Sequence, residues 1–335
     1  MTPLLVALFA YTAALAVLGP RLIRAWQRWQ SAAPRMGLVL WTALATSWVL
    51  AVISAGLAAM AQLSGGYGLA GLLHACLRAL LTILGVRSFT DVPAAIALLG
   101  SAVVIVRLVV VATRHIRRTR RHRELHRQAL RWSSPAVVRN GVRVAVVEAE
   151  QLAAYCVPGR CSTVVLTTGA LQRLVPAERD AVMAHEIAHL RGKHHLVLGW
   201  VAVLARAFPF VPLLKAASQE VARLVEWAAD DRAGRRHGNR AVARALAVMA
   251  TSGRRSATPV PKMALAAAGS GVPERVKRLL QPRAAVRAAR WRIVAALSLP
   301  AIALVAAAAV LVPCATVDPT PICSGRPSVT GSAHL

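Results

Sequence analysis

The chain has 335 residues, of which 56% are hydrophobic, with a mean hydropathy of +0.53 and a formal net charge of +28. This hydropathy is too high for an ordinary soluble protein and excludes that class. The basic charge fits either nucleic acid or an anionic membrane face, and the hydropathy favours the membrane. We therefore expect the lipid bilayer as a partner and no direct binding of nucleic acid.

Four apolar runs predict membrane-spanning helices. Three lie in the first third of the chain, at about residues 3–19, 37–62 and 94–113, and the fourth covers residues 291–312. Each has about the length that a hydrocarbon core of about 30 Å requires. Residues 68–86 are also apolar, but they contain a histidine and an arginine.

The arginines orient these segments. They cluster between residues 21 and 35 and again in the block Arg114–Arg131, and the positive-inside rule places both clusters in the cytoplasm. A crossing at residues 68–86 would put one cluster outside, so we expect none there. The prediction is a multi-pass protein of the cell membrane whose N-terminus and short tail, residues 313–335, are extracytoplasmic.

Residues 114–290 are then expected in the cytoplasm, as a domain in which short strands precede helices. Residues 142–147 and 162–168 are short and rich in β-branched residues, as strands are. Pro176 and the acids after it predict a helix start, because proline and carboxylates favour a first helical turn. The expected fold class is a mainly α membrane protein with four transmembrane helices and a cytoplasmic α+β domain between the third and fourth.

The helix that follows carries the pattern H-E-x-x-H at His185, Glu186 and His189. Two histidines four residues apart share one helix face and can bind one zinc ion through neutral imidazoles. Glu186 would stand beside the metal, close enough to take a proton from a water there. The pattern also occurs by chance in ordinary helices, so it needs support elsewhere in the chain.

Catalytic zinc needs a third protein ligand. Glu226 and Asp230 form an E-x-x-A-D pattern on one helix face, so Glu226 can ligate zinc while Asp230 accepts a hydrogen bond from a ligand histidine. The alternative is His195, because residues 185–195 also match the metzincin pattern H-E-x-x-H-x-x-G-x-x-H. Metzincin domains are secreted, whereas this motif is expected in the cytoplasm, which favours Glu226.

Residues 196–217 lie between the two motifs and are largely apolar. They cannot form a single membrane crossing, because His189 and Glu226 must meet on one side of the membrane. A hairpin or re-entrant element that contacts the membrane satisfies this condition, and so does a buried helix.

Together these motifs resemble those of membrane zinc metallopeptidases of the BlaR/MecR antirepressor type and, more distantly, of the HtpX- and Ste24-like peptidases. Residues 272–280 also resemble the segment that follows the zinc helices in such peptidases. The resemblance implies a zincin (gluzincin) domain with Zn²⁺ as cofactor, in which Glu186 is the general base, Asp230 supports a ligand histidine, and the zinc ligands are His185, His189 and Glu226.

The resemblance also implies a function, namely regulatory proteolysis of a cytoplasmic protein such as a winged-helix transcriptional repressor. The best-known members carry a penicillin-binding sensor domain after the fourth helix; residues 313–335 are too few for one, so we expect no β-lactam sensing. One alternative is an HtpX-like quality-control protease. A second is a non-catalytic membrane signalling protein with a structural zinc site, although such a site has no use for Glu186.

Overall fold

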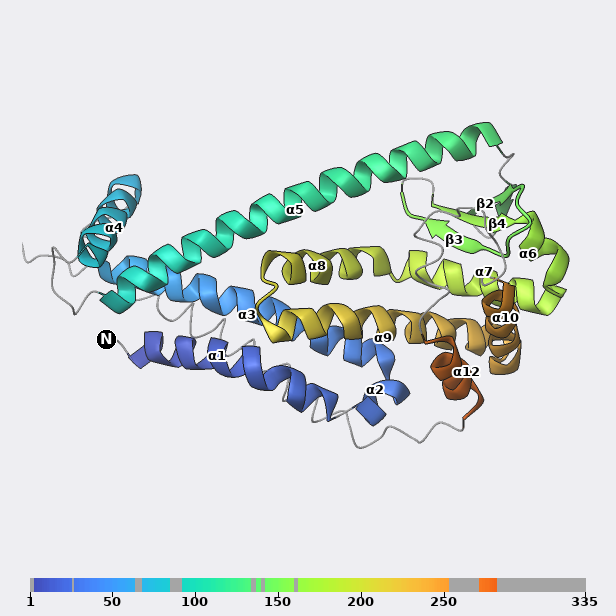
Figure 1. Cartoon of the computed structure of the whole chain (residues 1–335), viewed down its shortest axis with the longest axis horizontal. Coiled ribbons are helices and arrows are strands. Elements are labelled where there is room, and N and C mark those ends of the chain that lie inside the picture. Colours follow the sequence, from blue (N-terminus) through green and yellow to red (C-terminus); the bar gives the residue numbers. More distant parts are fainter. Residues whose placement is uncertain are drawn as a thin grey trace, which may run out of the picture.

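The computed structural model describes residues 3–25, 27–63, 68–84, 92–133, 137–139, 142–159, 162–252 and 271–281. The expected fourth transmembrane helix, residues 291–312, and the tail, residues 313–335, lie outside this set. Within it, long helices run side by side along one axis, and a small sheet with shorter helices lies at one end (Figure 1).

Helices form at the three N-terminal apolar runs: α1 (Pro3–Arg24), α3 (Pro34–Leu63) and α5 (Val92–Ser133). Two described stretches, Pro34–Ala59 in α3 and Ala95–Leu130 in α5, are long and apolar enough to cross a membrane, which indicates membrane association. The apolar stretch in α1, Val6–Arg21, is shorter. The remaining helices of this region are α2 (Gln27–Ala32) and α4 (Gly68–Ile83).

A helical hairpin fills the sequence between the two motifs. It consists of α8 (His194–Ala207) and α9 (Pro212–His237) and packs against α1, α3 and α5 (Figure 1). Phe208, in the turn of the hairpin, packs against Trp48 of α3 with the rings tilted by 56° and their centroids 5.5 Å apart, and Trp200 Nε1 donates to Thr46 Oγ1 at 2.9 Å. Buried apolar residues between the two motifs, in α8, in the turn and in α9, therefore form one core with α3.

The sheet has the strand order β1-β2-β4-β3 and comprises β1 (Val137–Arg139), β2 (Val142–Val147), β3 (Ala154–Val157) and β4 (Thr163–Thr167). β2 and β4 are parallel, with Val144 opposite Val164, and the outer strands are antiparallel to their neighbours. Strands form at both predicted places. β3 has β4 as its one strand neighbour among the described strands, so its other side is an edge.

The helix with the first motif begins where its sequence predicts. After α6 (Thr168–Arg173), α7 (Pro176–Arg191) starts with proline in its first turn, and Glu178 accepts the backbone N–H of Val175 at 3.2 Å. α7 packs against β3, β4, α9 and α10 (Asn239–Ser252), and α12 (Val272–Leu280) packs on α9 and α10. The two motif-bearing helices are thus neighbours.

Truncation of a buried leucine of α8 tests the hairpin packing. Leu204 is fully buried, whereas Leu196 on the same helix is 59% exposed. We expect Leu204→Ala to destabilise the protein by about 2–5 kcal/mol, because it leaves a cavity in the core, and Leu196→Ala to change stability by less than about 0.5 kcal/mol. The measurement is the melting temperature in detergent; equal shifts for the two variants would contradict the packing of this hairpin.

Candidate metal centre

The motif histidines of α7 face Glu226 in the second half of α9. His185 Nε2 and His189 Nε2 are 3.0 Å apart. The two carboxylate oxygens of Glu226 lie 3.4 Å from His185 Nε2 and 3.6 Å from His189 Nε2. Within the described part of the chain, these three residues form the one group of side chains that could hold a metal ion, with their ligand atoms within 4.8 Å of one another.

The geometry and charge of this group fit zinc. Tetrahedral zinc with ligands at about 2.0–2.1 Å separates its ligand atoms by about 3.3 Å, and the observed separations of 3.0, 3.4 and 3.6 Å bracket that value. Burial opposes protonation of His185, but Asp230 and Glu226 outweigh it and raise the pKa of His185 to about 10. The site therefore attracts positive charge strongly.

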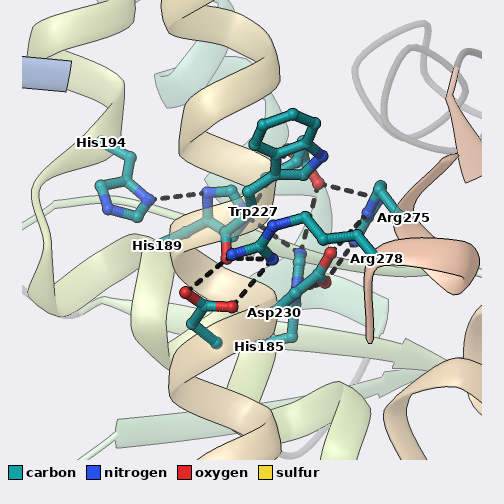
Figure 2. Close-up of polar contacts among 9 residues, drawn as sticks. His185, His189, His194, Trp227, Asp230, Arg275 and Arg278 are labelled. Carbon is teal, nitrogen blue, oxygen red and sulfur yellow. Dashed lines mark hydrogen bonds and ion pairs between the residues drawn. The ribbon is translucent and has the colours of Figure 1, made fainter. Parts of the chain in front are cut away.

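Each motif histidine contacts a second side chain through its other ring nitrogen (Figure 2). His185 Nδ1 lies 3.0 Å from Oδ1 of the fully buried Asp230. His189 Nδ1 lies 3.2 Å from Nδ1 of His194. Burial lowers the pKa of His194 to about 4, so its ring is neutral at pH 7 and can accept the His189 N–H. Such contacts fix the ring orientation and leave Nε2 of each ligand histidine for a metal.

His194 and His195, the first two residues of α8, lie in different surroundings. Lys193 has a left-handed backbone, with φ of 48°, and a Cβ on Gly192 would lie 2.3 Å from His194 Nε2. The glycine thus permits the close approach of His194 to the end of α7. His195, the alternative third ligand, lies outside the metal group and lines a separate cavity with Arg123. The metzincin spacing of the sequence pointed to His195 as a third ligand. The sequence feature that could have indicated His194 is Gly192, two residues before it.

Arg275 of α12 connects the acids of α9. Its Nε and Nη2 donate to the two oxygens of Asp230 at 2.8 and 2.7 Å, and its Nη1 lies 3.0 Å from Glu226 Oε2. Burial raises the pKa of each carboxyl, but contacts with His185 and Arg275 outweigh it. The pKa of Glu226 falls to about 2, and that of Asp230 is held well below its usual range. Both groups are therefore carboxylates at neutral pH.

A second arginine fixes α12 in place. Arg278 Nη1 lies 2.8 Å from Asp231 Oδ1, and the guanidinium stands over the ring of Trp227 at 5.1 Å (Figure 2). Its Nε donates to the backbone oxygen of Ser31, at the end of α2, at 2.8 Å. α12 is therefore held against both α9 and α2, the short helix that follows α1.

Glu186 lies on α7 and lines an apolar cavity together with His185 and Glu226 of the metal group. Burial, the largest cause, raises its pKa to about 7. A carboxyl group with such a pKa gains and loses a proton readily at neutral pH, as a general base must. The cavity is also lined by apolar side chains of α7, α10, α12 and β3, among them Ala154, Val182, Val242, Leu246, Met249 and Val272. The arrangement can hold an apolar group beside a metal and a base.

Comparison with known proteins identifies a family. The model of peptidase family M48 matches residues 115–283, about half of the chain. This range begins within α5 and ends after α12, so it includes the sheet, both motifs and the two arginines of α12. No curated protein and no solved structure matches the chain.

Removal of one ligand at a time separates the two possible third ligands. Glu226→Ala should lower bound zinc well below one ion per chain, because two histidines do not complete a site with three protein ligands. His195→Ala should leave the zinc content unchanged. The measurement is metal content of the detergent-purified protein by mass spectrometry; zinc loss in His195→Ala alone would show that the site is of the metzincin kind.

Substitution of His194, with the adjacent His195 as a matched control, tests whether His194 orients His189. His194→Ala should weaken zinc binding about 10- to 100-fold, because the partner that orients His189 is removed. His195→Ala is the control, since it deletes the same side chain one position further on. Zinc affinity is measured by competition with a chelator of known affinity, and equal affinities of the two variants would contradict the role of His194.

Proposed function

The chain belongs to peptidase family M48, a family of zinc metalloproteases, and from this premise we propose that it is an integral membrane zinc endopeptidase that cleaves a protein substrate. The observation that carries the proposal is the meeting of His185, His189 and Glu226 in one group, of which His185 and Glu226 line an apolar cavity together with Glu186. A purely structural zinc site uses four protein ligands and has no need of a base, so this arrangement favours catalysis.

Different residues of the site would bind the metal, transfer the proton and orient the metal-binding rings. His185, His189 and Glu226 would hold the zinc ion, which supplies a Lewis acid for the scissile carbonyl and lowers the pKa of a water. Glu186 accepts the proton of the attacking water and delivers it to the leaving amine. Asp230 and His194 keep the ligand rings oriented during both steps.

The edge strand β3 offers a place for the substrate backbone. An extended peptide can add to a free strand edge by main-chain hydrogen bonds, and its alternate side chains enter neighbouring pockets. Ala154, the first residue of β3, lines the apolar cavity beside Glu186. A peptide that binds along β3 therefore passes the metal group and places an apolar side chain in this cavity, next to the scissile bond.

The membrane topology is part of the proposal. We infer that the peptidase domain faces the cytoplasm, with the N-terminus outside, because α1 ends with Arg21 and Arg24 and α5 continues from its apolar run into the basic block. The hairpin of α8 and α9 supports a position at the membrane, since it packs on the apolar helix α3.

For the biological role we propose regulatory proteolysis of a cytoplasmic protein, with a winged-helix transcriptional repressor as the expected kind of substrate. The resemblance of the motifs to those of antirepressor peptidases supports this role. The family match equally accommodates an HtpX-like quality-control protease. Cleavage of many unrelated unfolded proteins at similar rates would favour quality control, and selective cleavage of one folded protein would favour regulation.

Substitution of the base tests the mechanism. Glu186→Gln should retain one zinc ion per chain, because Glu186 is not a ligand, and should lower peptide-bond hydrolysis about 10²- to 10⁴-fold. The measurement is the cleavage rate of denatured casein and of quenched fluorescent peptides, together with metal content. Glu148→Gln, at an exposed acid after β2, is the control, and undiminished cleavage by Glu186→Gln would refute the mechanism.

A further inference from the structure

A second cavity, of about 1180 Å³, lies between α5, the residues after β3 and the turn from α7 to α8. Its lining is strongly basic. One carboxylate, Glu124, also lines it and lies 3.5 Å from Arg127 Nη1. The basic side chains of this cavity, called the basic cavity below, are Arg120, Arg121, Arg123, Arg127, Lys193 and His195.

The cations of the basic cavity are incompletely satisfied by the protein. Arg127 donates to the backbone oxygen of Pro158 at 2.6 Å, but the buried Nε of Arg123 has no hydrogen-bond partner. A buried donor without a partner is costly, most of all on a charged group. Four arginines and one lysine around a single carboxylate also repel one another. Both features would be relieved by an anionic ligand.

The basic cavity and the apolar cavity lie at opposite ends of β3. Ala154, where β3 begins, lines the apolar cavity, whereas Pro158 and Gly159, directly after β3, line the basic one. Four residues of strand span about 13 Å. Lys193, which lines the basic cavity, follows His189 of the metal group by four residues. A peptide along β3 therefore reaches from the metal centre to the basic cavity.

We propose that the basic cavity is a substrate subsite that binds an acidic segment of the protein to be cleaved. The inference rests on the proposed peptidase function and adds a selectivity to it. Antiparallel pairing is the more stable way for a strand to join an edge, and it places the N-terminal part of the peptide at the end of β3. The acidic residues therefore precede the scissile bond by about four positions, because each residue of an extended chain covers about 3.3 Å.

Membrane depth argues for a peptide rather than a lipid headgroup in the basic cavity. The apolar run of α5 ends at residue 113, and a helix rises about 1.5 Å per residue, so Arg120 and Arg127 lie about 10 and 21 Å beyond it. The polar layer of a bilayer leaflet is about 5–8 Å deep. Arg114 and Arg117 stand at headgroup depth, and the basic cavity lies further from the hydrocarbon.

The experiment compares cleavage sites in a complex peptide mixture. Detergent-purified wild type digests a library of peptides from denatured proteins, and mass spectrometry identifies the residues around each cut. We expect Asp and Glu to be enriched three to six positions before the scissile bond. In Arg120→Glu/Arg123→Glu this enrichment should vanish, and kcat/KM for an acidic peptide should fall at least about tenfold, the effect of one lost charge-assisted hydrogen bond.

A matched variant controls for net charge. Arg114→Glu/Arg117→Glu makes the same change on the same helix but outside the basic cavity, and it should keep the acidic preference. Zinc content and melting temperature establish that both double variants are folded. Unselective cleavage by wild type, or an unchanged preference in Arg120→Glu/Arg123→Glu, would overturn the inference while leaving the peptidase function intact.

A binding measurement separates this inference from the proposed chemistry. Glu186→Gln should bind a fluorescent acidic peptide at least about tenfold more tightly than its Gln-substituted analogue, and added salt should reduce the difference. Equal binding of the two peptides would overturn the subsite even where no cleavage occurs. Loss of binding to vesicles with anionic lipid in Arg120→Glu/Arg123→Glu, with peptide selectivity unchanged, would instead assign the cavity to lipid.

Discussion

The metal centre depends on one buried network of charge between α7, α9 and α12. Burial of a carboxylate or a charged imidazole without compensation costs several kcal/mol. Here Asp230 is fully enclosed, with His185 at 3.0 Å on one side and two nitrogens of Arg275 at 2.7 and 2.8 Å on the other. The same guanidinium lies 3.0 Å from Glu226. Arg275 therefore stabilises the ionised form of both carboxylates that the site requires.

This network is also connected to the long apolar helices. The first half of α9 lies in the apolar core with α3, and its second half carries Glu226 and Asp230. α12 bonds to α9 through Asp230 and Asp231 and to the end of α2 through Arg278. Glu226 is thus carried by a helix whose other end is fixed in the apolar core, so packing between the long helices helps to position it beside His185 and His189.

The uneven distribution of charge fits a peptidase at a membrane. Apolar residues form the core between the long helices, and the cations of α5 divide into a group near the apolar run and a group around the basic cavity. β3 lies between that cavity and the apolar one beside Glu186. A substrate bound along β3 would meet an apolar cavity next to its scissile bond and a basic cavity at the other end of the strand.

The sequence by itself determined the residues whose function depends on local spacing. His185 and His189 share a face because a helix repeats every 3.6 residues, and the same rule joins Glu226 to Asp230. Strands β2 and β4 and the start of α7 follow from composition and from helix-start chemistry. These features need no information about distant parts of the chain.

Only the tertiary structure decided which separate segments meet. It brought His194 to His189 through the left-handed turn at Lys193, and it directed His195 into the basic cavity. It placed Arg275 on the acids of α9, and it resolved the apolar residues between the motifs as a packed hairpin. β3 has four residues, too few for a periodic pattern. Contacts between distant segments depend on packing, which no local pattern encodes.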